Sequence, residues 1–376
     1  MTQHRFSSFW LPRAAAVLAA LTAIAIVLLG TILQVQGAQA LAGESAFRTI
    51  TDRSGRRVRI PETPRRIACL FGPSYEKLLA FGATDRVSMV ANVTLPWNLV
   101  LNPGLGAIPV LTTYGSPDVE TLLRLKTDLV IYHPFTKQIN QMTAAGLPVV
   151  VPYDGSRRQH TLEGFFKDWY GQIRFYGKIL GGDAVARAEV YCDYADRRIR
   201  DVLSVTAEIP KDRCPKVFWY CGQVNGPAGT QTRHATADWL VTAAGGTMLT
   251  HEEAAYFVSV STEELILWNP DIILVSTLPS VEPVLSDPRL KNIAAVQNQR
   301  VFMTPQGQFY WSHFSTESFL CILYLAKLFH PEKFPDLDMV EELTGYYAQF
   351  YHYDLTGDQA RRILSHLPPG SKDQHP

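Results

Sequence analysis

The sequence predicts an α/β protein of two lobes, each built on a parallel sheet, linked by a single long α-helix with a ligand cleft between the lobes. Three observations predict this fold class. Short apolar strands alternate with helices, which favours parallel sheets with right-handed crossovers. The alternation pauses at one long helical segment after Gly182 and restarts after Pro210. The chain has 376 residues, more than one hydrophobic core usually serves.

The first lobe is predicted over residues 46–182. Alternating side chains around Ser54-Gly55 indicate a β-hairpin over residues 47–60. The apolar run 66–71 is typical of a buried parallel strand. The elements expected after it are a helix at 75–81, a strand at 85–91, a helix at 118–125, a strand at 128–132, a helix ending at Ala145, a strand at 148–151 and a helix at 164–180.

A linking helix is predicted over residues 183–209, with its helical pattern running from Asp183 to about Val205. The second lobe is predicted over residues 213–330, and C-terminal helices over residues 331–368 are expected to pack on the lobes. The elements expected in these parts are strands at 216–221, 271–275 and 300–303, and helices at 235–244, 262–268, 292–296, 315–329, 337–351 and 359–366.

The two lobes repeat one motif, because residues 119–131 resemble residues 262–274. Each copy is a short helix that begins near a glutamate, followed by a turn, an aspartate and an apolar strand. Because each lobe contains this helix–strand unit within an alternating α/β pattern, each lobe is expected to be Rossmann-like. In such folds ligands bind where the carboxyl ends of the strands face one another. The repeat therefore predicts the cleft.

The N-terminal 40 residues are predicted to be a secretory signal peptide. Basic residues precede an apolar run over residues 14–33, and Ala38-Gln39-Ala40 has the small-x-small pattern of a cleavage site. The run is also long enough to span a membrane, so an uncleaved anchor is the alternative. Either way, the rest of the chain is expected outside the cytoplasm.

Charge and cysteine content exclude several classes of protein. Lys plus Arg and Asp plus Glu both number 35, and this balance argues against a nucleic-acid partner. The five cysteines form no CxxC or Cys/His metal spacing. The nearest pair, Cys214 and Cys221, would lie about 20 Å apart along an extended segment, beyond disulfide reach. We therefore expect most of the cysteines to be buried thiols.

Several motifs occur in the order found in one known family. They are the paired repeat above, Pro64-Arg65-Arg66-Ile67 before the first buried strand, Ala243-Ala244-Gly245-Gly246, and the segments 325–332 and 350–356. With these motifs the chain resembles the periplasmic binding proteins of iron-siderophore, haem, cobalamin and related metal-chelate ABC importers. The resemblance implies two lobes bridged by one long helix, here residues 183–205, and a cleft that is largely preformed.

The resemblance also implies partners. In the family one glutamate on each lobe docks on the permease dimer, which works with an ATPase, and by motif position these are Glu120 and Glu263. A glutamate in a first helical turn also favours the helix dipole, which is the structural alternative. The expected protein is a monomer without a resident cofactor, and its cargo contains iron or another metal. A ferric siderophore-type chelate is preferred, with molybdate or tungstate, cobalamin and haem as alternatives.

Candidate ligand contacts lie in the loops that follow strand carboxyl ends. Aromatic side chains there offer flat area with a polar tip, which suits a chelate of mixed polarity, although core packing is the competing explanation. Arg233 and His234 precede a helix and could form an anion site, unless Arg233 caps a loop carbonyl. The predicted ligand-binding residues are Ser74, Tyr75, Trp97, Tyr114, His133, Arg233, His234, Tyr310 and Trp311.

The sequence gives less support to a carrier of bare metal ions, an enzyme or a signalling receptor. A bare-metal carrier needs three or four converging ligands, and only His133 and His234, with His313 as a third, are placed for this. No nucleophile elbow, phosphate loop, dinucleotide fingerprint or HExxH motif occurs, so we predict no enzyme. An enzyme or a signalling receptor on the same fold is the alternative from another class.

Overall fold

The computed structural model describes residues 46–91, 95–111, 117–153, 159–221 and 228–370. The predicted signal peptide and Tyr114 lie outside these residues. Among the helices that the model describes, none is both long enough and apolar enough to cross a membrane. From Arg48 onward the chain forms one compact unit.

The first sheet contains four parallel strands in the order β4-β3-β5-β6. Its strand residues are almost all buried because both faces are covered, as expected for a parallel sheet. A separate hairpin, β1-β2, precedes it. The elements of this part are β1 (Phe47–Thr51), β2 (Arg57–Pro61), β3 (Ile67–Cys69), α2 (Ser74–Ala80), β4 (Val87–Val90), α3 (Pro96–Leu101), α4 (Val119–Arg124), β5 (Leu129–Ile131), α5 (Thr136–Ala144) and β6 (Val149–Val150), with 3-10 turns at Thr84–Arg86 and Pro103–Ala107.

The second sheet repeats the architecture with parallel strands in the order β12-β11-β7-β9. Its elements are β7 (Lys216–Tyr220), α8 (Thr236–Ala243), β9 (Thr247–Met248), α9 (Thr262–Trp268), β11 (Ile272–Val275), α10 (Glu282–Leu285), α11 (Ala294–Gln297) and β12 (Val301–Met303), preceded by a 3-10 turn at Lys211–Arg213. The predicted α/β fold with two parallel sheets is confirmed.

One pair of strands was not predicted. β8 (Ala228–Gln231) and β10 (Phe257–Val260) form an antiparallel ladder beside β7. The β8 sequence, AGTQ, is too short and too poor in β-branched residues to signal a strand. Gly229 is required there because a Cβ at this position would collide with the Cys221 carbonyl and the Phe257 ring.

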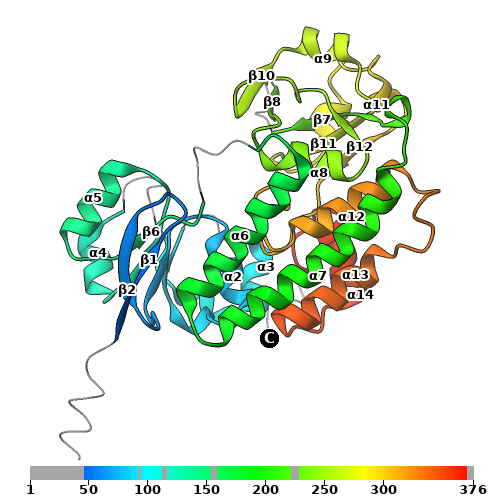
Figure 1. Cartoon of the computed structure of the whole chain (residues 1–376). Coiled ribbons are helices and arrows are strands. Elements are labelled where there is room, and N and C mark those ends of the chain that lie inside the picture. The colour runs from blue at the N-terminus through cyan, green and yellow to red at the C-terminus, as the bar shows by residue number, and fades with distance from the viewer. Residues whose placement is uncertain (1–45, 92–94, 112–116, 154–158, 222–227, 371–376) are drawn as a thin grey trace, which may run out of the picture. The chain divides into compact units, whose positions relative to one another are not determined.

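Two long helices connect the sheets, α6 (Leu162–Leu180) and α7 (Asp183–Thr206). They lie side by side (Figure 1), joined by Gly181 and Gly182, which both have positive φ. At Gly177 an added Cβ would lie 2.7 Å from the Ala188 Cβ, so the helices approach closely. α6 contacts α2 and α8, and α7 contacts α8 and α12 (Ser318–Phe329). The predicted long helix is therefore present, and α6 accompanies it.

One apolar interior joins both sheets. Residues on the inner faces, such as Ile67 and Leu129 in the first sheet and Trp219 and Leu274 in the second, belong to a single buried cluster that runs through α6, α7 and α12. The outer faces pack into separate clusters. The C-terminal elements that complete the shared interior are α13 (Met339–Tyr346), a π-helical turn at Tyr347–Tyr351 and α14 (Gly357–Leu364).

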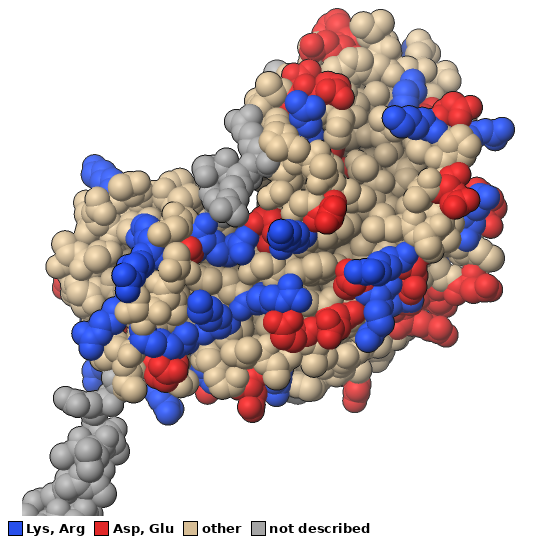
Figure 2. All heavy atoms as spheres, viewed as in Figure 1, with Lys and Arg blue, Asp and Glu red and all other residues tan. Residues whose placement is uncertain are grey.

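Charges of both signs occur on the face shown in Figure 2. Ion pairs of the protein include Arg174 with Glu189 at 2.8 Å and Arg200 with Asp196 at 2.7 Å. Basic side chains are more frequent over the left half of this face and acidic ones along its right edge, and over the whole sequence the two kinds balance. The five cysteines are free thiols, three of them buried.

Candidate functional site

A cavity of about 640 Å³ is lined by residues from both halves of the molecule. Its lining includes segments that follow β3, β5, β6 and β12, the approach to α8, and one face of α6, so it lies where the strand carboxyl ends and the connecting helices meet. The lining residues are Phe71, Gly72, Pro73, His133, Pro134, Tyr153, Gln159, Phe165, Asp168, Gln172, His234, Ala235, Thr236, Trp239, Tyr256, Phe309, Tyr310, His313 and Phe314.

The cavity wall is mainly aromatic. The Phe71 ring stacks on Tyr153, with 4.9 Å between ring centroids, and meets His133 edge-on at the same distance. The ring centroids of Phe165 and Phe314 lie 5.5 Å apart, and those of Tyr310 and His313 lie 5.4 Å apart. Rings in mutual contact hold one another in place, so this wall presents flat apolar area that is already ordered.

Neutral histidines add polar atoms to this wall. The Nδ1 atom of His133 lies 3.1 Å from the Tyr153 hydroxyl, and burial lowers the pKa of His133 to about 4. This imidazole is therefore uncharged at pH 7. Among the residues that the structure describes, no three His, Cys, Asp or Glu side chains are grouped so that they could hold a metal ion. In this part of the chain His133, His234 and His313 are therefore not grouped as metal ligands.

The lining carries little net charge. Asp168 contributes a carboxylate, and Arg53, outside the lining, forms an ion pair with it. No lysine or arginine occurs among the described lining residues. Beside Asp168, one turn further along α6, lies Gln172, which is 1% exposed. The described part of the cavity is therefore apolar, with a few neutral polar groups.

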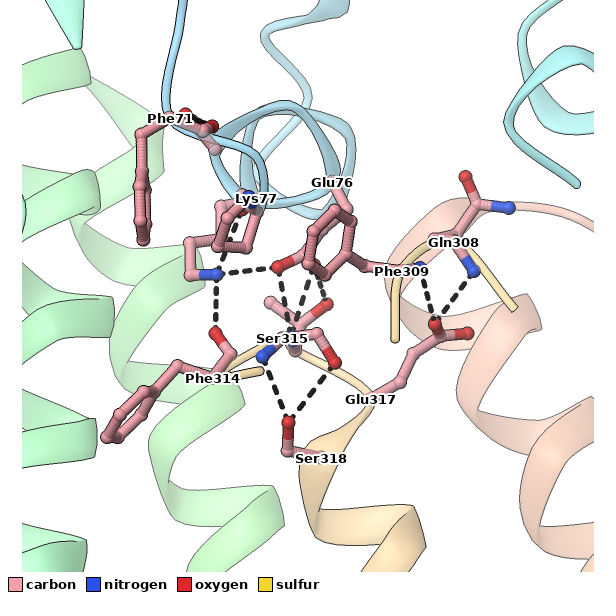
Figure 3. Close-up of polar contacts among 12 residues, drawn as sticks. Phe71, Glu76, Lys77, Gln308, Phe309, Phe314, Ser315, Glu317 and Ser318 are labelled. Carbon is pink, nitrogen blue, oxygen red and sulfur yellow. Dashed lines mark hydrogen bonds and ion pairs between the residues drawn. The ribbon is translucent and has the colours of Figure 1, made fainter. Parts of the chain in front are cut away.

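A buried ion pair fixes one cavity wall to the first half of the molecule (Figure 3). Lys77 Nζ donates to Glu76 at 2.6 Å, to the Phe314 carbonyl at 2.7 Å and to the Pro73 carbonyl at 3.0 Å. The backbone N–H of Thr316 donates to Glu76 at 3.1 Å. Glu76 and Lys77 belong to α2 and are 1% and 0% exposed. They therefore hold the segment that carries Phe314 in position.

A second buried carboxyl group supports the same wall from the other side (Figure 3). Glu317 accepts hydrogen bonds from the backbone N–H of Gln308 at 2.7 Å and of Phe309 at 3.2 Å. The Tyr347 hydroxyl also donates to it, at 2.6 Å. Burial raises the pKa of Glu317 from 4.5 to about 8. Glu317 is thus a positioning group for the turn that presents Phe309 and Tyr310 to the cavity.

This raised pKa predicts a pH-dependent stability. Between pH 4.5 and 8 the folded protein retains a proton on Glu317 that the unfolded chain has released, so the stability contributed by the protonated carboxyl is lost as pH rises through about 8. From pH 6.5 to 8 the free energy of unfolding should fall by at most about 1.4 kcal/mol per pH unit from this one group. The Glu317→Gln variant should lack this component, as measured by urea unfolding across that range.

The comparison is made above pH 6.5 because the depressed pKa of His133 acts in the opposite direction below it. After burial, the groups that act most strongly on the pKa of Glu317 are the Tyr347 hydroxyl, the backbone N–H of Phe309 and Glu76, and all three remain in the variant. Parallel stability curves for the variant and the wild type would show that Glu317 is already ionised at pH 6.5.

The structure brings only part of the predicted site to the cavity. His133, His234 and Tyr310 line it. Four more predicted residues are buried outside the lining, where they pack or bond within the protein. Ser74 donates to the Phe71 carbonyl, Tyr75 accepts from Asn102, Trp97 donates to the Leu367 carbonyl, and Trp311 packs on Tyr324. For these four, core packing is the reason for the buried side chain, and a role in ligand contact stays a prediction.

Arg233 is also outside the lining, although its neighbour His234 is part of it. Its guanidinium forms an ion pair with the exposed Glu252 at 3.2 Å. The first turn of α8 is partly satisfied within the protein, because the N–H of Ala237 donates to the Gln231 side chain at 2.9 Å. The predicted anion site consists of the Arg233 guanidinium and the first turn of α8. Both therefore already have partners within the protein that would compete with an anion.

Several lining residues were not among the predicted contacts. The most informative are on α6, where Phe165, Asp168 and Gln172 follow a helical spacing that places them on one face. The signal in the sequence was present: Asp168 and Gln172 are polar residues on a helix face that is otherwise aromatic, with Phe165, Trp169 and Tyr176. Such polar exceptions on a buried face indicate either an internal hydrogen bond or a ligand.

The two predicted docking residues occupy equivalent places. Glu120 is in the first turn of α4 after the cap Asp118, and Glu263 is in the first turn of α9 after the cap Ser261. Both side chains are exposed. Within the described part of the chain, neither forms a salt bridge. The repeat seen in the sequence is thus also a repeat in the structure.

Similar proteins match most of the chain that carries this cavity. A family model described as "Periplasmic binding protein" matches residues 67–307, more than half of the chain. The molybdate-binding protein MolA of Haemophilus influenzae is 25% identical over 345 residues, which cover 84% of this chain and 94% of MolA. The structure of MolA bound to molybdate is similar with a TM-score of 0.74 at 22% identity, covering 82% of this chain and 99% of that one.

Two further solved structures share the fold. A periplasmic solute binding protein from Veillonella parvula has a TM-score of 0.70 at 22% identity, covering 85% of this chain and 97% of its own. A protein of an ABC-type Fe3+-hydroxamate transport system from Saccharomonospora viridis has a TM-score of 0.61 at 20% identity, covering 75% and 98%. The matched relatives are solute-binding proteins and not enzymes.

Proposed function

The chain belongs to the periplasmic binding protein family, and from this premise we propose that it captures a metal chelate, of the ferric siderophore type, for an ABC importer. Family membership places such proteins in the periplasm. We propose that this chain reaches it through the N-terminal segment 1–40, acts there as a monomer, and passes its cargo to a permease dimer driven by an ATPase.

The observation that carries the choice of ligand is the size and lining of the cavity. About 640 Å³ is many times the roughly 30 Å³ that one water takes in the liquid, so an oxyanion of four oxygens would fill a minor part of it. The wall is aromatic, and its described residues include no cation to balance a bare anion. An uncharged chelate with an apolar exterior matches both properties.

Molybdate is the second candidate, and a specific observation favours it. MolA, named for molybdate binding, is 25% identical along most of this chain. Neutral donors such as the His133 imidazole and the Tyr310 hydroxyl could bind an oxyanion without a formal cation. Haem and cobalamin are further chelates to consider, and titration with each of them distinguishes them from a ferric siderophore.

Direct binding tests this proposal. Trp239 lines the cavity, so a bound ferric chelate should quench its fluorescence, and a Trp239→Phe variant identifies the signal. We expect a neutral ferric trihydroxamate to bind with a Kd in the micromolar range or below. At 100 times the Kd it should stabilise the fold by about 2.7 kcal/mol. Molybdate that binds more tightly than any chelate, haem or cobalamin would replace the chelate with an oxyanion.

We propose further that Glu120 and Glu263 dock on the permease. Both are exposed in equivalent first turns, and each is followed three residues later by an exposed aliphatic side chain, Leu123 at 48% and Ile266 at 42%. An apolar contact bordered by a polar group is the arrangement of an interface core and its rim. The two sites are also absent from the cavity lining, so docking and ligand binding involve separate residues.

A further inference from the structure

Gln172 is a buried polar side chain at the cavity whose hydrogen-bonding capacity is unused. It lies on α6, it is 1% exposed, and it is part of the cavity lining. Neither its amide nitrogen nor its amide oxygen has a hydrogen-bond partner among the described residues. Buried side-chain amides are normally bonded, so two unused atoms on one side chain call for an explanation.

Gln308 shows what the same residue does when it is part of the framework. It is also 1% exposed. Its amide nitrogen donates to the Trp97 carbonyl at 3.0 Å, and its amide oxygen accepts from Asn98 at 2.9 Å. Both polar atoms of Gln308 are therefore satisfied within the protein. Gln172 has the same chemistry and the same burial without these bonds, so the fold itself does not require its amide.

The surroundings of Gln172 restrict what can satisfy it. Phe165 and Asp168 share its helix face at the cavity, and the Asp168 carboxylate is already paired with Arg53. A side-chain amide offers a donor and an acceptor together. A ligand carboxylate would satisfy only the donor, and a ligand ammonium only the acceptor. A primary amide of the ligand, whose N–H and carbonyl lie side by side, satisfies both atoms at once.

We propose that Gln172 is a specificity-determining subsite that recognises an amide group in the organic part of the bound chelate. This inference rests on the proposed function and adds a substrate class to it. In the structure the amide atoms are covered, and rotation about the χ bonds of this flexible side chain brings them to the cavity that it lines. The cavity thereby selects amide-bearing chelates over chelates of the same metal that lack such a group.

The test compares two probes and two variants. The first probe is a ferric trihydroxamate that carries primary amide groups, and the second is ferric tris(N-methylacetohydroxamate), which has no N–H. Gln172→Met keeps the volume of the side chain and removes both polar atoms. We expect its affinity for the first probe to fall about 10- to 100-fold, and its affinity for the second to stay within twofold.

The stability of the ligand-free variants provides an independent measurement. Removing an unsatisfied buried amide should leave the melting temperature of Gln172→Met unchanged or raised. The matched variant Gln308→Met removes a satisfied amide of equal burial and should lower it. A melting temperature that falls as much in Gln172→Met as in Gln308→Met would show that Gln172 has a structural partner and overturn the proposal. So would equal affinities of wild type and Gln172→Met for the amide-bearing probe.

Failure of the proposed function gives a different result. A wild-type protein that binds neither ferric probe contradicts chelate transport, and with it the amide class of ligand. A wild-type protein that binds both probes equally well, with no change in Gln172→Met, leaves chelate transport standing and rejects the subsite alone.

Discussion

The Lys77→Met variant is expected to lose about 3–5 kcal/mol of unfolding free energy, the loss typical of breaking one half of a buried ion pair. Glu76 and Lys77 are almost completely shielded from solvent, and burial lowers the pKa of Lys77, so its charge depends on Glu76. Methionine fills the space but leaves the Glu76 carboxylate without its cation. It also removes the bonds to the Pro73 and Phe314 carbonyls. Urea unfolding at pH 7 measures the loss.

A second substitution separates the charge from the packing. The double variant Glu76→Gln with Lys77→Met removes both charges and should recover much of the lost stability. Lys167→Met is the matched control, because Lys167 is exposed on α6 and its replacement should change stability by less than about 0.5 kcal/mol. A Lys77→Met variant that is as stable as this control would show that the ion pair does not stabilise the fold.

Reversing both docking charges, Glu120→Lys with Glu263→Lys, is expected to abolish uptake while the affinity for the ligand changes by less than twofold. Both side chains are exposed and absent from the cavity lining, so binding should be unaffected. A lysine in a first helical turn is unfavourable by only about 0.3–1 kcal/mol, so the fold should persist. Cargo uptake by cells that express the variant, together with fluorescence titration of the purified protein, gives the two quantities.

The control for this experiment is Glu163→Lys. Glu163 is an exposed glutamate in the first turn of α6, so its reversal carries the same helix-dipole penalty without touching either docking helix. Normal uptake by the double variant would refute the docking assignment. A parallel loss of ligand affinity would instead assign the effect to the binding site.

Most of the fold could be predicted because its signals are local. Asp118 was expected to cap a helix, and its carboxylate accepts from the N–H groups of Glu120 and Thr121. Gly146 was expected to end a helix, and it has a positive φ of 85°. The antiparallel β8-β10 pair escaped prediction because it forms between segments about 30 residues apart, and a four-residue strand that contains glycine has no periodic pattern.

The cavity was harder to predict than the fold. Strand order indicates which loops meet, and His133, His234 and Tyr310 were found in this way. Within one loop, however, neighbouring aromatic residues differ in their position: Tyr310 lines the cavity, and Trp311 is buried against Tyr324. The amino-acid composition of a loop does not show which of its side chains faces a cavity and which is buried in the core. The α6 face with Asp168 and Gln172 does not follow a strand. The rule that ligands bind at the carboxyl ends of strands therefore could not predict it.

The apolar interior that both sheets share through α6, α7 and α12 has a consequence for cargo exchange. Swinging the halves widely apart would expose this interior and break the bonds of Lys77 and Glu76 to residues 314–316. We therefore expect the two halves to move little on binding, so that closure reduces the affinity only slightly. Ligands that are too large or too small for a fixed cavity should then both bind with lower affinity.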